Sequence, residues 1–197
     1  MEDIIHQAAG SVGSALFITI IALISVPKLV QLYANTSSRT SKSIALNQED
    51  DCEFIRNLVT RASAVAENQP WEQWEAPVIT KYENGALFSS HNDASPTKGS
   101  EWIDQGGQRI VTVIAYLNSC AEGGATRFDV LDINVQPKQG SCLVFFPSSS
   151  TTLEADERTV HQSLPSVGEK YIVQLFGRVQ RCPPPLGIPD IFGTERE

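Results

Sequence analysis

Short runs of alternating apolar and polar residues fill the second half of the chain, and turn-forming residues separate them. Alternation with a period of two is typical of β-strands that bury one face. Gly-containing pairs between the runs, such as Asn84-Gly85 and Gly123-Gly124, favour turns. The pattern predicts strands over Pro77–Tyr82, Arg109–Leu117, Val130–Val135, Ser141–Phe146, Thr159–Ser163 and Lys170–Arg178. Many short strands with few helices among them predict a mainly β fold, either a sandwich or a barrel.

A helical pattern precedes these strands. Apolar residues spaced three and four apart predict a helix over Ser43–Ala66, and we interpret its apolar face as a packing surface. The residues of this face are Phe54, Ile55, Leu58, Val59, Ala62 and Val65. Asn47 can cap the helix, and the acidic residues 49–51 suit its first turn. The Ser/Thr-rich segment 34–42 is predicted to be a linker.

The N-terminal segment is strongly apolar. Residues 7–26 carry no charge, and their length matches that of a membrane-spanning helix. An acidic start, with Glu2 and Asp3, is unusual for a signal peptide. By the positive-inside rule, the basic residues Lys28, Arg39 and Lys42 after the segment would leave the main domain in the cytosol. Three interpretations stay open: a membrane anchor inserted through residues 7–27, a buried helix of the globular domain, and a signal peptide. The first places the protein on a membrane of the endoplasmic reticulum type, and the second in the cytoplasm.

These patterns divide the chain into four parts. Residues 1–34 form the apolar N-terminal segment, and residues 35–72 form the linker and a supporting helix. Residues 73–179 form the β domain. Residues 180–197 form a tail, which Pro183-Pro184-Pro185 predicts to be extended.

Composition and charge narrow the class of protein. Apolar residues make up 41% and charged residues 19% of the 197 residues, which excludes an intrinsically disordered chain. The net charge of −8 argues against a nucleic-acid partner, because nonspecific binding needs clustered Lys and Arg. The cysteines Cys52, Cys120, Cys142 and Cys182 form no C-x-x-C pair, which argues against a cysteine zinc site. Free thiols in a reducing compartment are favoured, with one or two disulfides in a lumenal protein as the alternative.

Two histidines and an aspartate have the spacing of a metal site. His91 and Asp93 are two residues apart, so that in an extended segment both side chains project to the same side. His161 lies 70 residues further along, in a predicted strand. Two imidazoles and one carboxylate on one face of an octahedron suit non-haem Fe(II) oxygenases, because three positions stay open. The pair His91-x-Asp93 alone is a weak signal, and His161 strengthens it.

Lys170 indicates the kind of co-substrate that would bind beside such a metal. It follows His161 by nine residues, and Pro165 and Gly168 let the chain turn back as a neighbouring strand. A lysine buried near the metal needs an anionic partner. One end of a dicarboxylate co-substrate could supply that partner, while the other end binds the metal. The alternative for Lys170 alone is a solvated surface lysine.

The motifs together resemble the prolyl 4-hydroxylase branch of the Fe(II)/2-oxoglutarate dioxygenases, from about Arg39 to Arg178. The segment KYENGALFSSHND is similar to the family's Tyr-x-x-Gly and His-x-Asp motifs. The segment GGQRIVTVIAYLNSCAEGGATRF is similar to its Arg-bearing strand and Gly-Gly-x-Thr-x-Phe motif, and VQPKQGSCLVFF to its Pro-x-x-Gly strand. The segment TVHQSLPSVGEKYIVQLFGR resembles the distal His and Gly-x-Lys motifs. Their order and spacing are more specific than any one motif.

The resemblance implies a fold and a set of roles. The fold would be a double-stranded β-helix, a jelly-roll with flanking helices, and residues 73–179 would be the dioxygenase domain. Fe(II) would bind to His91, Asp93 and His161. The far carboxylate of 2-oxoglutarate would bind to Lys170 and Tyr82. The substrate side would comprise Arg109, Arg39 and Ser41. O₂ would be a substrate, and L-ascorbate would rescue oxidised iron.

The substrate is the open question. A peptidyl proline is the first expectation from the resemblance, and a peptide or protein would then be the partner. The same iron chemistry on another side chain or on a small molecule is the alternative, because Phe88, Phe176 and Arg178 depart from residues common in the family. A jelly-roll that binds a metal without catalysis is an alternative of another class. A cupin-type isomerase would leave Lys170 unexplained.

Overall fold

A computed structural model describes residues 31–33, 38–46 and 52–188 of the chain. The expected membrane anchor at residues 7–27, the cap at Asn47 and the acidic turn at 49–51 lie outside the described residues. Among the described residues, no helix is long and apolar enough to cross a membrane. The membrane anchor therefore stays a prediction.

Two antiparallel sheets make up most of the described chain. The large sheet contains β1 (Gln31–Tyr33), β2 (Lys42–Ala45), β3 (Val78–Tyr82), β5 (Arg109–Tyr116), β8 (Cys142–Phe145) and β10 (Lys170–Arg178). Its strand order is β1-β2-β3-β10-β5-β8. The small sheet contains β4 (Phe88–His91), β6 (Thr126–Phe128), β7 (Ile133–Val135) and β9 (His161–Ser163), in the order β4-β9-β6-β7. From β3 to β10 the chain passes repeatedly from one sheet to the other, and this alternation makes the fold a jelly-roll, as predicted.

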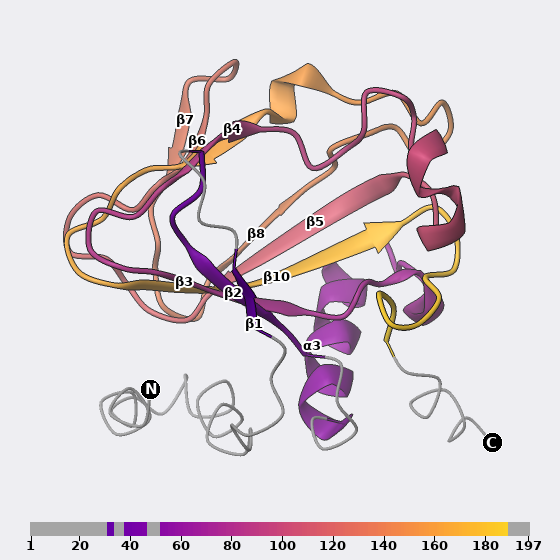
Figure 1. Ribbon diagram of the computed structural model, residues 1–197, viewed down its shortest axis with the longest axis horizontal. Coiled ribbons are helices and arrows are strands. Elements are labelled where there is room, and N and C mark those ends of the chain that lie inside the picture. Colours follow the sequence, from indigo (N-terminus) through magenta and orange to yellow (C-terminus); the bar gives the residue numbers. More distant parts are fainter. Residues whose placement is uncertain (1–30, 34–37, 47–51, 189–197) are drawn as a thin grey trace.

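One α-helix covers the outer face of the large sheet. The α-helix α3 (Cys52–Val65) lies on one side of the large sheet, and the small sheet with β4 and β6 lies on the other (Figure 1). Short 3₁₀ turns are η3 (Trp71–Gln73), η4 (Ser100–Gln105) and η5 (Glu157–Thr159). The apolar face of α3 packs on the large sheet, where Val173 and Leu175 are buried. The predicted role of this face as a packing surface is therefore confirmed.

Alternation along β10 separates two cores. Val173 and Leu175 face α3, whereas Ile172 belongs to the core between the two sheets. The polar residues Lys170 and Gln174 share the inner face with Ile172, and both are buried. The inner face of the large sheet thus carries polar groups inside the sandwich, where they need partners.

The strand pattern near the N-terminus differs from the prediction. Residues 42–45 were expected at the junction of linker and helix, but they form β2, which pairs with β1 and β3. The described helix α3 spans only Cys52–Val65. The physical reason is that β3 offers an unpaired edge, and its hydrogen bonds outweigh the weak helix preference of Ser43 and Ile44.

Two further differences concern short strands. The expected strand Val130–Val135 is reduced to Ile133–Val135, because the residues before it form a turn that reverses the chain from β6 into β7. Strands β1, β4 and β6 were not predicted. Each has three or four residues, which are too few for a periodic signal, and only the pairing with a neighbouring strand defines it.

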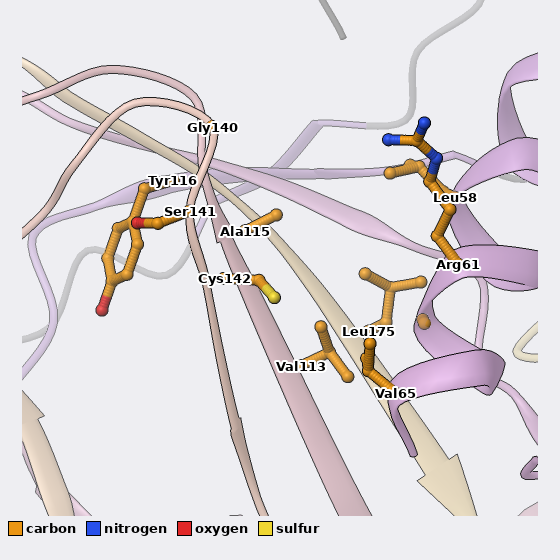
Figure 2. A pocket seen from close by; sticks show the side chains of 11 residues that line it. Leu58, Arg61, Val65, Val113, Ala115, Tyr116, Gly140, Ser141, Cys142 and Leu175 are labelled. Carbon is orange, nitrogen blue, oxygen red and sulfur yellow. The ribbon is translucent and has the colours of Figure 1, made fainter. Parts of the chain in front are cut away.

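A pocket of about 180 Å³ lies between α3 and the large sheet. Figure 2 shows Leu58 and Val65 of the helix on one side and Val113, Ala115 and Leu175 of the sheet on the other. These side chains belong to or adjoin the helix-side core, on the face of the large sheet opposite to the small sheet. The pocket is therefore separate from the residues predicted to bind a metal.

Candidate metal centre

Strand pairing brings the two predicted histidine ligands together. His91 ends β4 and His161 begins β9, and the two residues lie directly opposite each other in the antiparallel pair. Their ring centroids are 4.4 Å apart. Asp93 follows β4 by two residues, and one ligand atom from each of the three residues lies within 4.8 Å of the others. The predicted triad is thus assembled in space.

The carboxylate of Asp93 faces both imidazoles. Its Oδ1 lies 3.6 Å from Nε2 of His91, and its Oδ2 lies 3.9 Å from Nε2 of His161. Asp93 is 5% exposed and His161 is 3% exposed. The carboxylate also accepts a hydrogen bond of 2.9 Å at Oδ2 from Oγ1 of Thr112.

Backbone carbonyls determine which ring nitrogens are free. Nδ1 of His91 lies 2.8 Å from the carbonyl oxygen of Ser89, and Nδ1 of His161 lies 2.9 Å from that of Thr159. A carbonyl can only accept, so each Nδ1 carries a proton, and in the neutral form of the ring Nε2 then presents a lone pair. Burial and the neighbouring His161 lower the pKa of His91, which favours the neutral ring. Two imidazoles that turn Nε2 toward one carboxylate fit the donor set of a non-haem Fe(II) ion.

Aromatic rings pack against both histidines of the cluster. Phe88 stacks on His91 with centroids 3.8 Å apart. Phe145 and Phe128 lie 4.9 Å and 5.5 Å from the ring of His161, measured between centroids. An apolar wall of this kind keeps water out and strengthens electrostatic interactions at the centre.

Lys170 is a buried cation between the two sheets. It is 1% exposed, and its Nζ donates to the carbonyl of Gly124 at 2.9 Å and to the hydroxyl of Ser163. In the part of the chain that the structure describes, no carboxylate pairs with Lys170. Desolvation by burial accordingly lowers its pKa to about 8. A buried ammonium group with only neutral partners is costly, and a carboxylate of a ligand would complete its environment.

Tyr82 lies beside Lys170. The two residues are register partners on β3 and β10, and Nζ lies 4.4 Å from the centroid of the Tyr82 ring. The Tyr82 hydroxyl interacts with Ser163 and Ser41, and burial raises its pKa. The phenol is therefore a neutral donor at the same place as the ammonium group.

Arg39 and Ser41 lie beside Phe88 and Tyr82, respectively. Nε of Arg39 donates to Ser41 Oγ at 2.8 Å, and the guanidinium lies 4.7 Å above the ring of Phe88. Phe88 in turn stacks on His91, so Arg39 contacts a ring that packs on a predicted ligand. Ser41 is 4% exposed. The structure thus brings both residues toward the triad.

Arg109 lies in a separate ion-pair cluster. Its Nε and Nη2 donate to the two carboxylate oxygens of Glu75, at 2.7 Å and 2.9 Å. Arg178 donates to the same carboxylate at 2.7 Å, and the guanidinium of Arg109 lies 3.8 Å from the ring of Phe176. The side chain of Arg109 remains 22% exposed. Its strongest partner is therefore Glu75, which sequence reasoning did not identify.

Other residues of the site were also missed. Thr112 is a polar residue inside the otherwise apolar run of β5, and this break in the pattern could have indicated a buried polar contact. Ser163 follows His161 by two residues, so strand alternation places both on one face. The carbonyl of Gly124 has no signal in the sequence pattern, because its position depends on the turn before β6.

Comparisons with known proteins agree with this geometry. The family model described as the 2OG-Fe(II) oxygenase superfamily matches residues 77–178. A relative from Acanthamoeba polyphaga mimivirus is 33% identical over 118 residues, which cover 58% of this chain and 49% of the relative. Prolyl 4-hydroxylase 2 of Arabidopsis thaliana is 31% identical over 124 residues, which cover 52% and 40%. The chain spans about half the length of the curated relatives it matches.

A solved structure shares the fold. It is the viral collagen prolyl hydroxylase of Paramecium Bursaria Chlorella virus-1 in its 2OG complex, with a TM-score of 0.60 and 21% identity. The match covers 82% of this chain and 86% of that one. At this identity the likeness supports the jelly-roll fold and leaves the activity to be argued from the site.

Proposed function

This chain belongs to the 2OG-Fe(II) oxygenase superfamily, and from this premise we propose that it is a dioxygenase that uses Fe(II) and 2-oxoglutarate to hydroxylate a C–H bond. A peptidyl proline is the proposed target, since relatives of this chain carry the name prolyl 4-hydroxylase. The observation that carries the proposal is the pairing of a His-Asp-His cluster with a buried lysine that has no carboxylate partner among the described residues.

The proposed metal ligands are Nε2 of His91, Nε2 of His161 and the carboxylate of Asp93. When bound there, ferrous iron supplies the activation of O₂ that couples oxidation of 2-oxoglutarate to hydroxylation. The protein holds both imidazoles in the binding tautomer through the carbonyls of Ser89 and Thr159. The rings of Phe128 and Phe145 keep water away from His161.

Lys170 and Tyr82 are the proposed anchor of the far carboxylate of 2-oxoglutarate. An ammonium group and a phenol can each donate to one carboxylate. Ser163 links this anchor to the metal centre, because it contacts Lys170 and lies two residues from His161. Binding of the dicarboxylate would supply an ion-pair partner for Lys170 and raise the pKa of Lys170.

The substrate side is proposed to include Arg39, Ser41 and Arg109. Arg39 lies over the ring of Phe88 and donates a hydrogen bond to Ser41. Arg109 keeps an exposed part while Glu75 holds its guanidinium in place. L-ascorbate is proposed as the reductant that restores Fe(II) after turnover without substrate.

The test is succinate formation from 2-oxoglutarate in the presence of Fe(II), ascorbate and Pro-rich peptides. Mass spectrometry of the peptides should detect the gain of one oxygen atom. His91→Ala and Asp93→Ala should abolish both products. Asp132→Ala serves as the matched control, because the Asp132 side chain is 83% exposed and lies on the hairpin between β6 and β7. Equal succinate formation by the wild type and the ligand variants would refute the proposal.

The second candidate is the same chemistry on another side chain or a small molecule. Phe176 and Phe88 both contact arginines proposed for the substrate side, so differences at these positions bear on the substrate. Free amino acids tested beside the peptides would separate the two candidates. A non-catalytic metal-binding module would bind the metal and form no succinate with any of them.

A further inference from the structure

Thr112 places a hydroxyl group where the strand pattern favours apolar side chains. It lies on the inner face of β5 with Phe145 and Phe176 as register partners, and its side chain is 0% exposed. A hydroxyl in such an environment is unfavourable unless it forms a hydrogen bond. Its bond is the one of 2.9 Å to Oδ2 of Asp93, which joins the large sheet to the segment that follows β4.

The hydrogen bond from Thr112 is what holds the side chain of Asp93. Asp93 lies beyond the end of β4, so strand pairing does not hold its side chain. The Nε2 atoms of His91 and His161 lie 3.6 Å and 3.9 Å from the carboxylate oxygens, beyond hydrogen-bond distance, so neither imidazole holds the carboxylate by a hydrogen bond. Of the described residues, Thr112 supplies the hydrogen-bond donor that the structure shows at this carboxylate.

We propose that Thr112 is a positioning residue that reserves Oδ2 of Asp93, so that Asp93 offers Oδ1 alone to the metal. The identity of the metal rests on the proposed function. Two imidazoles and one carboxylate oxygen leave three positions of an octahedron open, which O₂ and a chelating keto acid need together. A carboxylate that turned to bind through both oxygens would occupy one of these positions.

Metal titration tests this role without relying on turnover. Metal-free protein is titrated with Co(II), and its ligand-field absorption is recorded as a measure of affinity and coordination. Thr112→Val keeps the branched shape and removes the donor, whereas Thr112→Ser keeps the donor. Thr80→Val is the matched control, because Thr80 is also 0% exposed in the large sheet but bonds to Ser43 and Gln174.

We expect Thr112→Val to weaken Co(II) binding about 10- to 100-fold and to change the absorption spectrum, as for other residues that orient metal ligands. Thr112→Ser should restore both. Thr80→Val should lose stability and keep the wild-type affinity and spectrum. Thr112→Ala provides the same test if Thr112→Val does not fold.

Wild-type affinity and spectrum in a folded variant without the hydroxyl would overturn the role of Thr112. A separate outcome concerns the metal centre itself. If the wild type and Asp93→Ala bound Co(II) equally, the proposed function would fail, and the role of Thr112 would fail with it. The two failures are therefore distinguishable.

Discussion

Replacing Lys170 with methionine should separate stability from co-substrate binding. In the ligand-free protein, burial lowers the pKa of Lys170 from 10.5 to about 8, which corresponds to a cost of ~3 kcal/mol at neutral pH. Lys170→Met removes this cost, but it leaves the Gly124 carbonyl and the Ser163 hydroxyl without a donor. That loss costs about 1–3 kcal/mol. Because the two effects oppose each other, we expect the free energy of unfolding to change by less than about 2 kcal/mol.

The affinity for 2-oxoglutarate should change far more. Removing one partner of a buried, hydrogen-bonded charge pair costs about 2–5 kcal/mol. This corresponds to a rise in Kd from about 30-fold to several thousand-fold. Calorimetric titration of 2-oxoglutarate into Co(II)-loaded protein measures Kd, and urea unfolding measures stability. In turnover, KM for 2-oxoglutarate should rise more than kcat falls, because the contact is common to the ground and transition states.

Lys81→Met is the control for this experiment. Lys81 lies on β3 opposite Tyr171, the residue that follows Lys170 on β10. Unlike Lys170, Lys81 forms an ion pair with Glu169 near the surface. The Lys81→Met variant should bind 2-oxoglutarate with the Kd of the wild type. A wild-type Kd for Lys170→Met would refute the assignment of Lys170. A loss of stability as large as the loss of binding energy would instead make Lys170 a structural cation.

Three further predictions follow from the described contacts. Above pH 8, the Kd for 2-oxoglutarate should rise toward about tenfold per pH unit as Lys170 loses its proton, whereas burial raises the pKa of the neighbouring Tyr82 and Cys120. Deprotonation of Lys170 should also raise the free energy of unfolding of the ligand-free protein between pH 8 and 10.5, because in this range the unfolded state binds more protons than the folded state. If neither the Kd nor the free energy of unfolding changed with pH, the burial of Lys170 would be contradicted. Glu75→Gln should cost about 3–5 kcal/mol in urea unfolding, because Arg109 and Arg178 would lose their common carboxylate, and a cost below about 1 kcal/mol would show that solvent screens the cluster. Gly177→Ala should cost about 1–3 kcal/mol in the same assay, because the new Cβ would lie 2.5 Å from Cγ1 of Val111; an unchanged midpoint would mean that β5 yields freely.

Much of the sandwich could be predicted because its strands bury one face. The alternation in β3, β5, β8 and β10 gave bounds within a residue or two of those observed. The inner position of Lys170 and the outer position of Val173 follow from the same period. Prediction failed for β1, β2, β4 and β6, because three or four residues are too few to carry a periodic signal.

The sequence by itself determined the types of ligand and the local pairing of His91 with Asp93, since these depend on residue identity and the two-residue repeat of an extended chain. Only the tertiary structure decided that His161 lies opposite His91, because that contact depends on the register between β4 and β9. It also decided that Thr112 reaches Asp93 and that Glu75 engages Arg109. These contacts join residues from different strands and loops, and no local pattern encodes which side chains meet when two sheets close on each other.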